Sequence, residues 1–259
     1  MSAIAAFLGA FVVAGRDIGS HAVDVAVAVA VVFVFTGAGN SLNDYLDAEI
    51  DKVAHPERPI PSGAIARVRA KQLSSVLFGA AVLLSIYIGI YSLTIVIISL
   101  VLMVAYEFSL KKSGLSGNLT IAWLTASLFL YGAVSAGSIV PIWAFFVTSF
   151  LATLGREIIK DVQDMDADRG IRKTLPMAIG PAGSMAISSI SLAGAIIVSP
   201  FPYLLRQFGI LFLIVVLVAD VIFIYTAAIQ WKNASKAQSV AKAAMYIALL
   251  AFLVGALEV

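Results

Sequence analysis

The sequence AVDVAVAVAVVFVFTGAGNSLNDYLDAEID, residues 22–51, decides the fold, because it joins a long apolar run to a row of acids. Residues 22–43 are numerous and apolar enough to cross a membrane as a helix. Asp44, Asp47 and Asp51 lie at offsets of 0, 3 and 7 residues. On an α-helix these offsets fall within an arc of roughly 60°, so the three carboxylates form one acidic stripe.

The same spacing recurs later in the chain, at Asp161, Asp164 and Asp168. A basic residue directly follows each set, and each set leads into a Pro-containing basic loop. We predict that the regions 40–63 and 157–176 are diverged copies of an internal repeat. Both belong to a single predicted domain that covers residues 1–259.

The composition is that of an integral membrane protein. The chain is 61% hydrophobic and 12% charged, with a mean hydropathy of +1.01. A soluble domain is about half apolar and about 25% charged. The absence of cysteine excludes disulfides, thiolate metal sites and cysteine nucleophiles. The net charge of +2 gives no sign of a nucleic-acid partner, and none is expected.

The apolar runs predict an all-α integral membrane fold with nine transmembrane helices. Their expected ranges are 2–15, 22–43, 67–90, 92–108, 118–138, 141–160, 181–199, 207–229 and 239–257. All of the 17 Lys and Arg residues then fall on one side except Arg16 and Arg206. The positive-inside rule places the N-terminus and both acidic stripes in the cytoplasm and the C-terminus outside the cell membrane.

Three carboxylates on one stripe repel one another unless cations neutralise them. Carboxylate and amide oxygens suit Mg²⁺, which commonly bridges a few carboxylates to substrate phosphates. Two facing stripes would therefore hold Mg²⁺ ions around one diphosphate. The first alternative is a solvated acidic helix end, although such faces usually interleave basic residues at i+4. The second is a cation or solute transporter, which should place its acids near the middle of the bilayer.

Basic side chains near the same surface are candidates for binding phosphate oxygens. Arg58 follows the first stripe, Lys111 and Lys112 follow the fourth span, and Arg169, Arg172 and Lys173 follow the second stripe. Each alone is also compatible with a topology-setting charge at the lipid headgroups. Lys111 is the strongest candidate, because the glycine-containing turn at 114–118 could bring backbone close to a ligand. Glu107 lies one helical turn earlier and can orient Lys111.

These motifs resemble those of the UbiA superfamily of intramembrane prenyltransferases. The family motif N-D-x-x-D-x-x-x-D stands complete at residues 43–51, and D-x-x-x-D stands at residues 164–168. The sequence HPERPIPSG at residues 55–63 is similar to the family's loop after the first motif. Tyr106–Asn118 resembles its Y-x-x-x-L-K-x-x-G-x-x-G-N segment.

The resemblance implies nine transmembrane helices around a central cavity, with a polar active site that faces the cytoplasm and binds a prenyl diphosphate through Mg²⁺. The principal metal ligands that it implies are Asn43, Asp47, Asp164 and Asp168, supported by Asp44, Asp51 and Asp161. The catalytic residues that it implies are Asp47, Asp168 and Lys111. The substrate-binding residues that it implies are Asn40, Arg58, Tyr106, Lys111, Asn118 and Arg169.

Within the superfamily, the compact length and the sequence KDVQDMDADR at residues 160–169 are most similar to the archaeal-type ether-lipid enzymes. This likeness implies transfer of a geranylgeranyl group to geranylgeranylglyceryl phosphate, a lipid-like acceptor, within membrane lipid. The alternative acceptor is an aromatic or quinone precursor such as 4-hydroxybenzoate, because cavity shape decides the acceptor.

Overall fold

The computed structural model describes residues 2–140, 142–170 and 172–258. The elements in chain order are α1 (Ser2–Ala14), η1 (Gly15–His21), α2 (Ala22–Ala54), α3 (Arg67–Ile88), α4 (Ile90–Phe108), η2 (Leu110–Lys112), α5 (Leu115–Ser135), α6 (Ile142–Gln163), α7 (Leu175–Val198), α8 (Phe201–Leu204), α9 (Ile210–Ile229) and α10 (Ala234–Glu258). These ranges contain α- and 3-10 helices and no β-strand, so the predicted all-α fold is confirmed.

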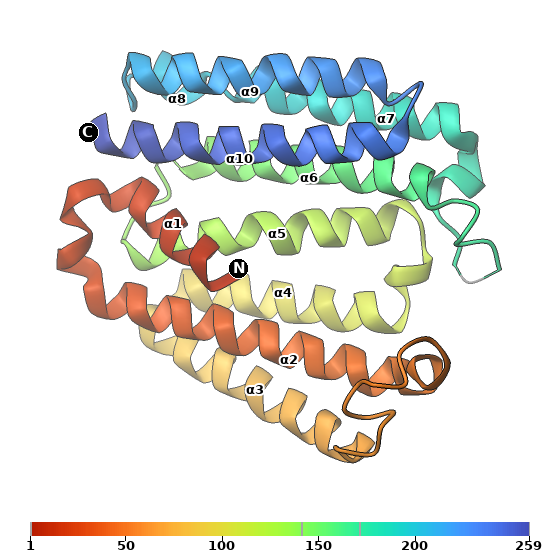
Figure 1. Ribbon diagram of the computed structural model, residues 1–259. Helices are drawn as coiled ribbons and strands as arrows, with labels where there is room; N and C mark the ends of the chain where they lie inside the picture. Colours follow the sequence, from red (N-terminus) through yellow and green to blue (C-terminus); the bar gives the residue numbers. More distant parts are fainter. Residues whose placement is uncertain (1, 141, 171, 259) are drawn as a thin grey trace.

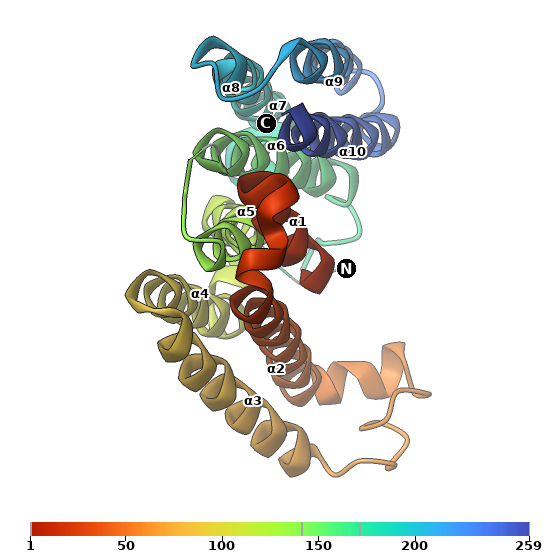
Figure 2. The ribbon, with the colours of Figure 1, turned by 90° about the vertical axis from the view of Figure 1, so that its left-hand side faces the viewer.

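The helices form an elongated bundle built around α5 (Figure 1). One side consists of α2, α3 and α4, and the other consists of α6, α7, α9 and α10, with α1 and α5 between them. The view turned by 90° shows the same order (Figure 2). The backbones of α1 and α5 lie close together at Gly9 and Gly132. A methyl group added at Gly132 would overlap the backbone oxygen of Ala6, so the close approach requires glycine there.

The chain is a multi-pass membrane protein. Eight segments are long and apolar enough to cross a membrane, and the first, Ser2–Val53, contains both α1 and most of α2. The 13 residues of α1 span about 20 Å, which is less than the roughly 30 Å hydrocarbon core. The count of nine spans therefore stays a prediction. Exposed apolar side chains such as Phe33, Ile90 and Tyr91 give the bundle a surface suited to lipid.

The length of α2 positions the first acidic motif. Its 33 residues extend over about 50 Å, whereas the hydrocarbon core of a bilayer is about 30 Å thick. If α2 crosses the bilayer, part of the helix therefore extends beyond the hydrocarbon. Figure 1 shows that α2, α4 and α6 all end on the same side of the bundle, where α3, α5 and α7 begin. Both acidic motifs therefore lie at one end of the molecule, as their positions after even-numbered spans predict.

The second motif is not the continuous helical stripe that its spacing predicts. α6 ends at Gln163, and residues 164–170 form turns. The amides of Asp164 and Asp168 still donate to carbonyls four residues earlier, at 2.9 and 3.0 Å. The predicted helix through Asp168 was wrong, because Asp carboxylates compete for backbone donors and favour turns. Gly170 has a φ of 82°, a left-handed conformation that ends helical structure.

Candidate active site

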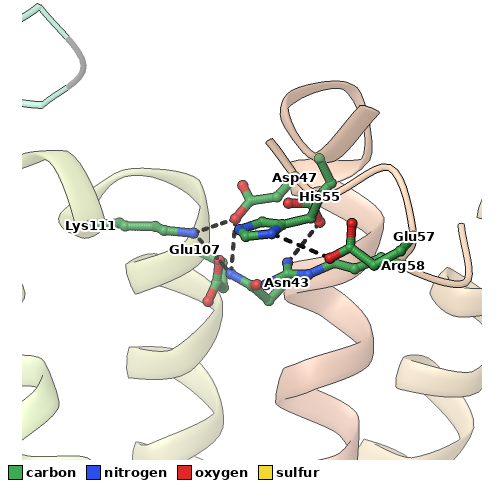
Figure 3. A network of polar contacts seen from close by, with 8 residues as sticks. Asn43, Asp47, His55, Glu57, Arg58, Glu107 and Lys111 are labelled. Carbon is green, nitrogen blue, oxygen red and sulfur yellow. Dashed lines mark hydrogen bonds and ion pairs between the residues drawn. The ribbon is translucent and has the colours of Figure 1, made fainter. Parts of the chain in front are cut away.

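The first motif is tied to α4 and to η2 by a polar network (Figure 3). Asn43 donates through Nδ2 to Asp47 Oδ2 at 3.2 Å and to Glu107 Oε2 at 3.0 Å. Lys111 donates through Nζ to the same Asp47 oxygen at 2.7 Å and to Glu107 Oε2 at 3.5 Å. The two carboxylates thus hold the single ammonium group of Lys111 near the ends of α2 and α4, and the amide of Asn43 bridges the same two carboxylates.

Lys111 remains a cation in this position. Burial of its side chain disfavours the charged form, but the hydrogen bond to Asp47 and the negative charge of Glu107 together outweigh it, so the pKa of Lys111 is raised. The turn after Lys111 depends on glycine. Gly114 has a φ of 54°, and a methyl group at Gly117 would lie 2.7 Å from the backbone oxygen of Leu110.

The third acid of each motif pairs with an arginine from the loop that follows it. Arg58 Nη1 lies 2.8 Å from Asp51 Oδ2, and Arg172 Nη2 lies 2.7 Å from Asp168 Oδ2. Contact with the carboxylate raises the pKa of each arginine against a smaller opposing effect of desolvation. Asp168 Oδ2 is buried and has no well-directed hydrogen bond, so its contact with Arg172 is an ion pair.

The first acid of the second motif is held by an amide from α5. Asn118 donates through Nδ2 to Asp161 Oδ2 at 2.9 Å. The two residues are only 7% and 6% exposed, so the bond joins α5 to α6 in the interior. The amide of Lys173 also donates to the carbonyl of Lys112 at 3.3 Å. The loop after the second motif is therefore docked on the turn that carries Lys111.

A polar cavity of about 270 Å³ lies where these connections meet. Its lining includes Tyr106, Lys111, Asn118, Glu157, Asp161 and Arg172. Lys111 is bonded to Asp47 of the first motif and faces the same cavity as Asp161 of the second. The cavity thus places Asp161 and Arg172, from the second motif and its loop, around the same space as Lys111, the partner of the first motif.

A second cavity, apolar and about 220 Å³ in volume, extends into the bundle between α2, α4 and α5. Asn40 lines it one helical turn before Asn43, so the cavity begins next to the polar network. Its walls include Phe35, Val96 and Leu128, and Tyr131 lies among the residues farthest along the helices from the motifs. An amphiphilic ligand can therefore place a charged head in the network and an apolar chain in the bundle.

The side chains at this end of the bundle fit Mg²⁺ that is held partly by substrate. Among the residues that the structure describes, no group of three or more His, Cys, Asp or Glu side chains converges into a metal cage. Mg²⁺ usually keeps several waters and uses one or two carboxylates together with substrate phosphates. Within the same ranges, Asp44 and Asp164 form no side-chain hydrogen bond or ion pair, so their oxygens are available for this mode of binding.

Residues 2–252 match the UbiA prenyltransferase family. The chain belongs to this family. It is 39% identical over 259 aligned residues to the digeranylgeranylglyceryl phosphate synthase of Natronomonas pharaonis. That alignment covers 98% of this chain and 91% of the relative.

Two solved structures share the UbiA fold with this chain. One is described as digeranylgeranylglyceryl phosphate synthase in membranes; it has a TM-score of 0.93 and 36% sequence identity, covering 100% of this chain and 94% of that one. The other is a UbiA homolog from Archaeoglobus fulgidus bound to GPP and Mg²⁺, with a TM-score of 0.68 and 16% identity. It covers 100% of this chain and 97% of that chain, and at this identity it supports the fold alone.

The UbiA-type site brings together most of the predicted residues, but not Arg169. The side chain of Arg169 is 70% exposed and pairs with Asp166, which is 85% exposed. Arg172, another of the cations predicted as candidates for binding phosphate oxygens, lines the polar cavity instead. α6 ends at Gln163, so Arg169 does not continue the acidic stripe of that helix. The position of Arg169 therefore does not support its predicted contact with substrate.

Sequence reasoning predicted the pairing of Glu107 with Lys111 but missed the contact of Glu107 with Asn43. The side chain of Glu107 is only 4% exposed and accepts hydrogen bonds from both Asn43 and Lys111. The i,i+4 spacing from Lys111 was a visible signal for that pair. The contact with Asn43 had no such signal, because the two residues are far apart in the chain and meet only when α2 packs beside α4.

Proposed function

We propose that the protein transfers a geranylgeranyl group from its diphosphate to geranylgeranylglyceryl phosphate in ether-lipid biosynthesis. The observation that carries the proposal is the position of Lys111, bonded to Asp47 and facing a cavity that Asp161 and Arg172 also line. An acid of the second motif and two cations around one space, with the first motif bonded to one of these cations, suit a diphosphate with divalent metal. The synthases that resemble this chain support glycerol phosphate as the head of the acceptor.

The carboxylates of the two motifs would hold Mg²⁺, because carboxylate and amide oxygens suit this ion and it commonly bridges a few carboxylates to substrate phosphates. The residues that would hold it are Asn43, Asp44, Asp47, Asp51, Asp161, Asp164 and Asp168. Bound there, Mg²⁺ supplies positive charge that stabilises the leaving diphosphate. The protein itself brings these acids to one end of the bundle and moderates their repulsion through Lys111, Arg58 and Arg172.

The cations of the site bind the phosphate oxygens of the substrates. Lys111 and Arg172 line the polar cavity, and Arg58 lies on the loop beside the first motif. Charge-assisted hydrogen bonds from such groups are about twice as strong as neutral ones. They gain strength as negative charge accumulates on the leaving diphosphate, and so they lower the barrier to C–O cleavage.

In the proposed reaction, the bond between C1 of the prenyl group and the diphosphate oxygen breaks to give an allylic cation. The free hydroxyl oxygen of the acceptor forms a new bond to C1, and its proton passes to the departing diphosphate or to a motif carboxylate. Asn40 and the apolar walls of the second cavity position the chain and exclude water, which would otherwise capture the cation.

The polar end of the bundle is proposed to face the cytoplasm, with the N-terminus inside and the C-terminus outside. The distribution of Lys and Arg supports this orientation. The C-terminus also lies at the end of the bundle opposite to both motifs (Figure 1). The substrates would then enter from the cytoplasmic leaflet, where a phosphorylated head stays in water and its chain stays in lipid.

The test is an acceptor panel with the purified protein in bilayers, radiolabelled geranylgeranyl diphosphate and Mg²⁺. We expect label to pass to geranylgeranylglyceryl phosphate and the transfer to stop when Mg²⁺ is chelated. Efficient labelling of 4-hydroxybenzoate with none of the glycerol phosphate would refute the ether-lipid acceptor and leave prenyl transfer intact. Failure to bind the labelled donor with Mg²⁺ present would refute prenyl transfer as well.

A further inference from the structure

We propose that Tyr131, held in place by Ser85, is the floor of the apolar cavity and limits the length of the prenyl chain on the donor. The inference rests on the proposed function, since it takes this cavity as the place where the donor chain lies. It goes beyond that function by assigning chain-length selection to one buried hydrogen-bonded pair.

Tyr131 is anchored from the side of α3. It is 2% exposed and lines the apolar cavity, and its hydroxyl oxygen lies 2.8 Å from Ser85 Oγ. Ser85 is fully buried and donates its own hydrogen to the carbonyl of Ala81 at 2.6 Å. Tyr131 is therefore the donor in its bond to Ser85, and both hydroxyl groups are satisfied. A buried phenol fixed in this way does not swing aside without losing a hydrogen bond.

Tyr131 belongs to a cluster of buried side chains at the far end of the apolar cavity. Tyr131, Val31, Val32, Ile95 and Val96 line the cavity and belong to the same buried cluster as three small residues that do not line it. Those three are Ala6, Ala28 and Ala81, each at most 1% exposed. Since the cavity lining stops at the bulky members of this cluster, an apolar chain that runs down from the motifs meets Tyr131 and its neighbours.

The distance along the helices from the polar network to the far end of the cavity matches the length of a geranylgeranyl chain. At a rise of 1.5 Å per residue, Val31 lies about 18 Å along α2 from Asn43, and Tyr131 lies about 20 Å along α5 from Asn118. An extended chain advances about 1.2 Å per single bond, so the 15 main-chain carbon–carbon bonds of a C20 prenyl group reach about 18 Å. A C15 group reaches about 13 Å and a C25 group about 23 Å on the same scale.

The distance from the polar network to Tyr131, rather than the volume of the cavity, carries this inference. An apolar cavity of about 150 Å³ holds one benzene ring, so the 220 Å³ enclosed here surrounds only part of a C20 chain. The cavity walls move apart to provide the additional volume that a C20 chain occupies. A floor that is hydrogen-bonded and backed by a packed cluster still stops a chain that is one isoprene unit too long.

The test is acceptor-free binding of C10, C15, C20 and C25 prenyl diphosphates to the full-length protein with Mg²⁺. We expect the wild type to prefer C20 over both C15 and C25 by at least about tenfold, the lower range for a size mismatch in an apolar pocket. Tyr131→Ala should move the preference to C25. Tyr131→Phe should keep the C20 preference, because it retains the ring that blocks the chain.

A second variant acts in the opposite direction and does not depend on a cavity-forming change. Val96→Phe fills the cavity above Tyr131 and should move the preference to C15. Tyr225→Ala, which removes a ring from an exposed position on α9, should leave the C20 preference unchanged. Wild-type binding that is indifferent to chain length, or the same preference in wild type, Tyr131→Ala and Val96→Phe, would overturn the proposal. A C20 preference without transfer to geranylgeranylglyceryl phosphate would refute only the proposed acceptor.

Discussion

Lys111 Nζ lies 2.7 Å from Asp47 Oδ2, so a side chain predicted to bind phosphate is in direct contact with one predicted to bind metal. Glu107 lies on the other side of the same ammonium group, at 3.5 Å. If Asp47 turns toward another cation, Glu107 still compensates the charge of Lys111. The arrangement lets Lys111 reach phosphate oxygens without leaving an ammonium group buried and unpaired.

Replacing Lys111 with Met should weaken the binding of prenyl diphosphate. The change removes a charge-assisted hydrogen bond worth roughly 1.5–3 kcal/mol, so we expect the dissociation constant to rise about ten- to a hundredfold. Binding of the radiolabelled donor with Mg²⁺ present measures the effect. Lys112→Met is the matched control, because Lys112 is the adjacent residue and its side chain is exposed. Equal losses in the two variants would show that only the general charge of the turn matters.

Removing a motif carboxylate should have a larger effect on turnover than on folding. We expect Asp47→Ala and Asp168→Ala each to lower kcat/KM at least about a hundredfold, since loss of even an outer-shell partner of a metal costs about 10- to 100-fold. Activity at several Mg²⁺ concentrations, together with a folding check by circular dichroism, measures the effect. Asp166→Asn is the control, because that side chain is 85% exposed and pairs only with Arg169. Near-normal turnover in both alanine variants would contradict the assignment of these acids.

Local patterns in the sequence were enough to predict which end of the bundle carries the site. The stripe at Asp44, Asp47 and Asp51 lies on one helix, and the end of each span follows from hydropathy. The run from Asp161 to Asp168 has the same spacing, but it does not share the same conformation, because α6 ends at Gln163. Residue spacing predicts a shared face only where the helix continues, and the acid-rich sequence after Gln163 favours turns.

Contacts between helices were outside the reach of local patterns. The bonds from Asn43 to Glu107 and from Asn118 to Asp161 each join two elements distant in the chain. The internal repeat stays a prediction, although Asp51 pairs with Arg58 and Asp168 pairs with Arg172. The two arginines do not occupy equivalent positions after their motifs, so the similarity lies in the ion pairs and not in the sequence of the loops.

The buried bond between Asn118 and Asp161 should support both stability and the second motif. In Asn118→Ala the carboxylate of Asp161 loses its donor in a position that is 6% exposed. Leaving a buried polar group unsatisfied costs about 1–3 kcal/mol, and more for a charged group. We expect a lower melting temperature in detergent than for the wild type. Adding Asp161→Asn to Asn118→Ala should recover part of the loss, because it removes the buried charge; a further decrease would argue against this account.

The contact between α1 and α5 should be intolerant of a single added methyl group. In Gly132→Ala the new Cβ would overlap the backbone oxygen of Ala6, so the helices must separate. Overpacking of this kind costs about 1–3 kcal/mol, and we expect the melting temperature to fall by about 2–4 °C for each kcal/mol. Gly79→Ala is the matched control, because no atom lies within 4 Å of the added methyl group and alanine favours helix. Gly79→Ala should melt at or above the wild-type temperature.

Because α1 also supplies Ala6 to the cluster beneath Tyr131, Gly132→Ala should in addition weaken the preference for C20 donors. Wild-type stability and donor preference in Gly132→Ala would show that α1 neither packs tightly on α5 nor helps to close the apolar cavity.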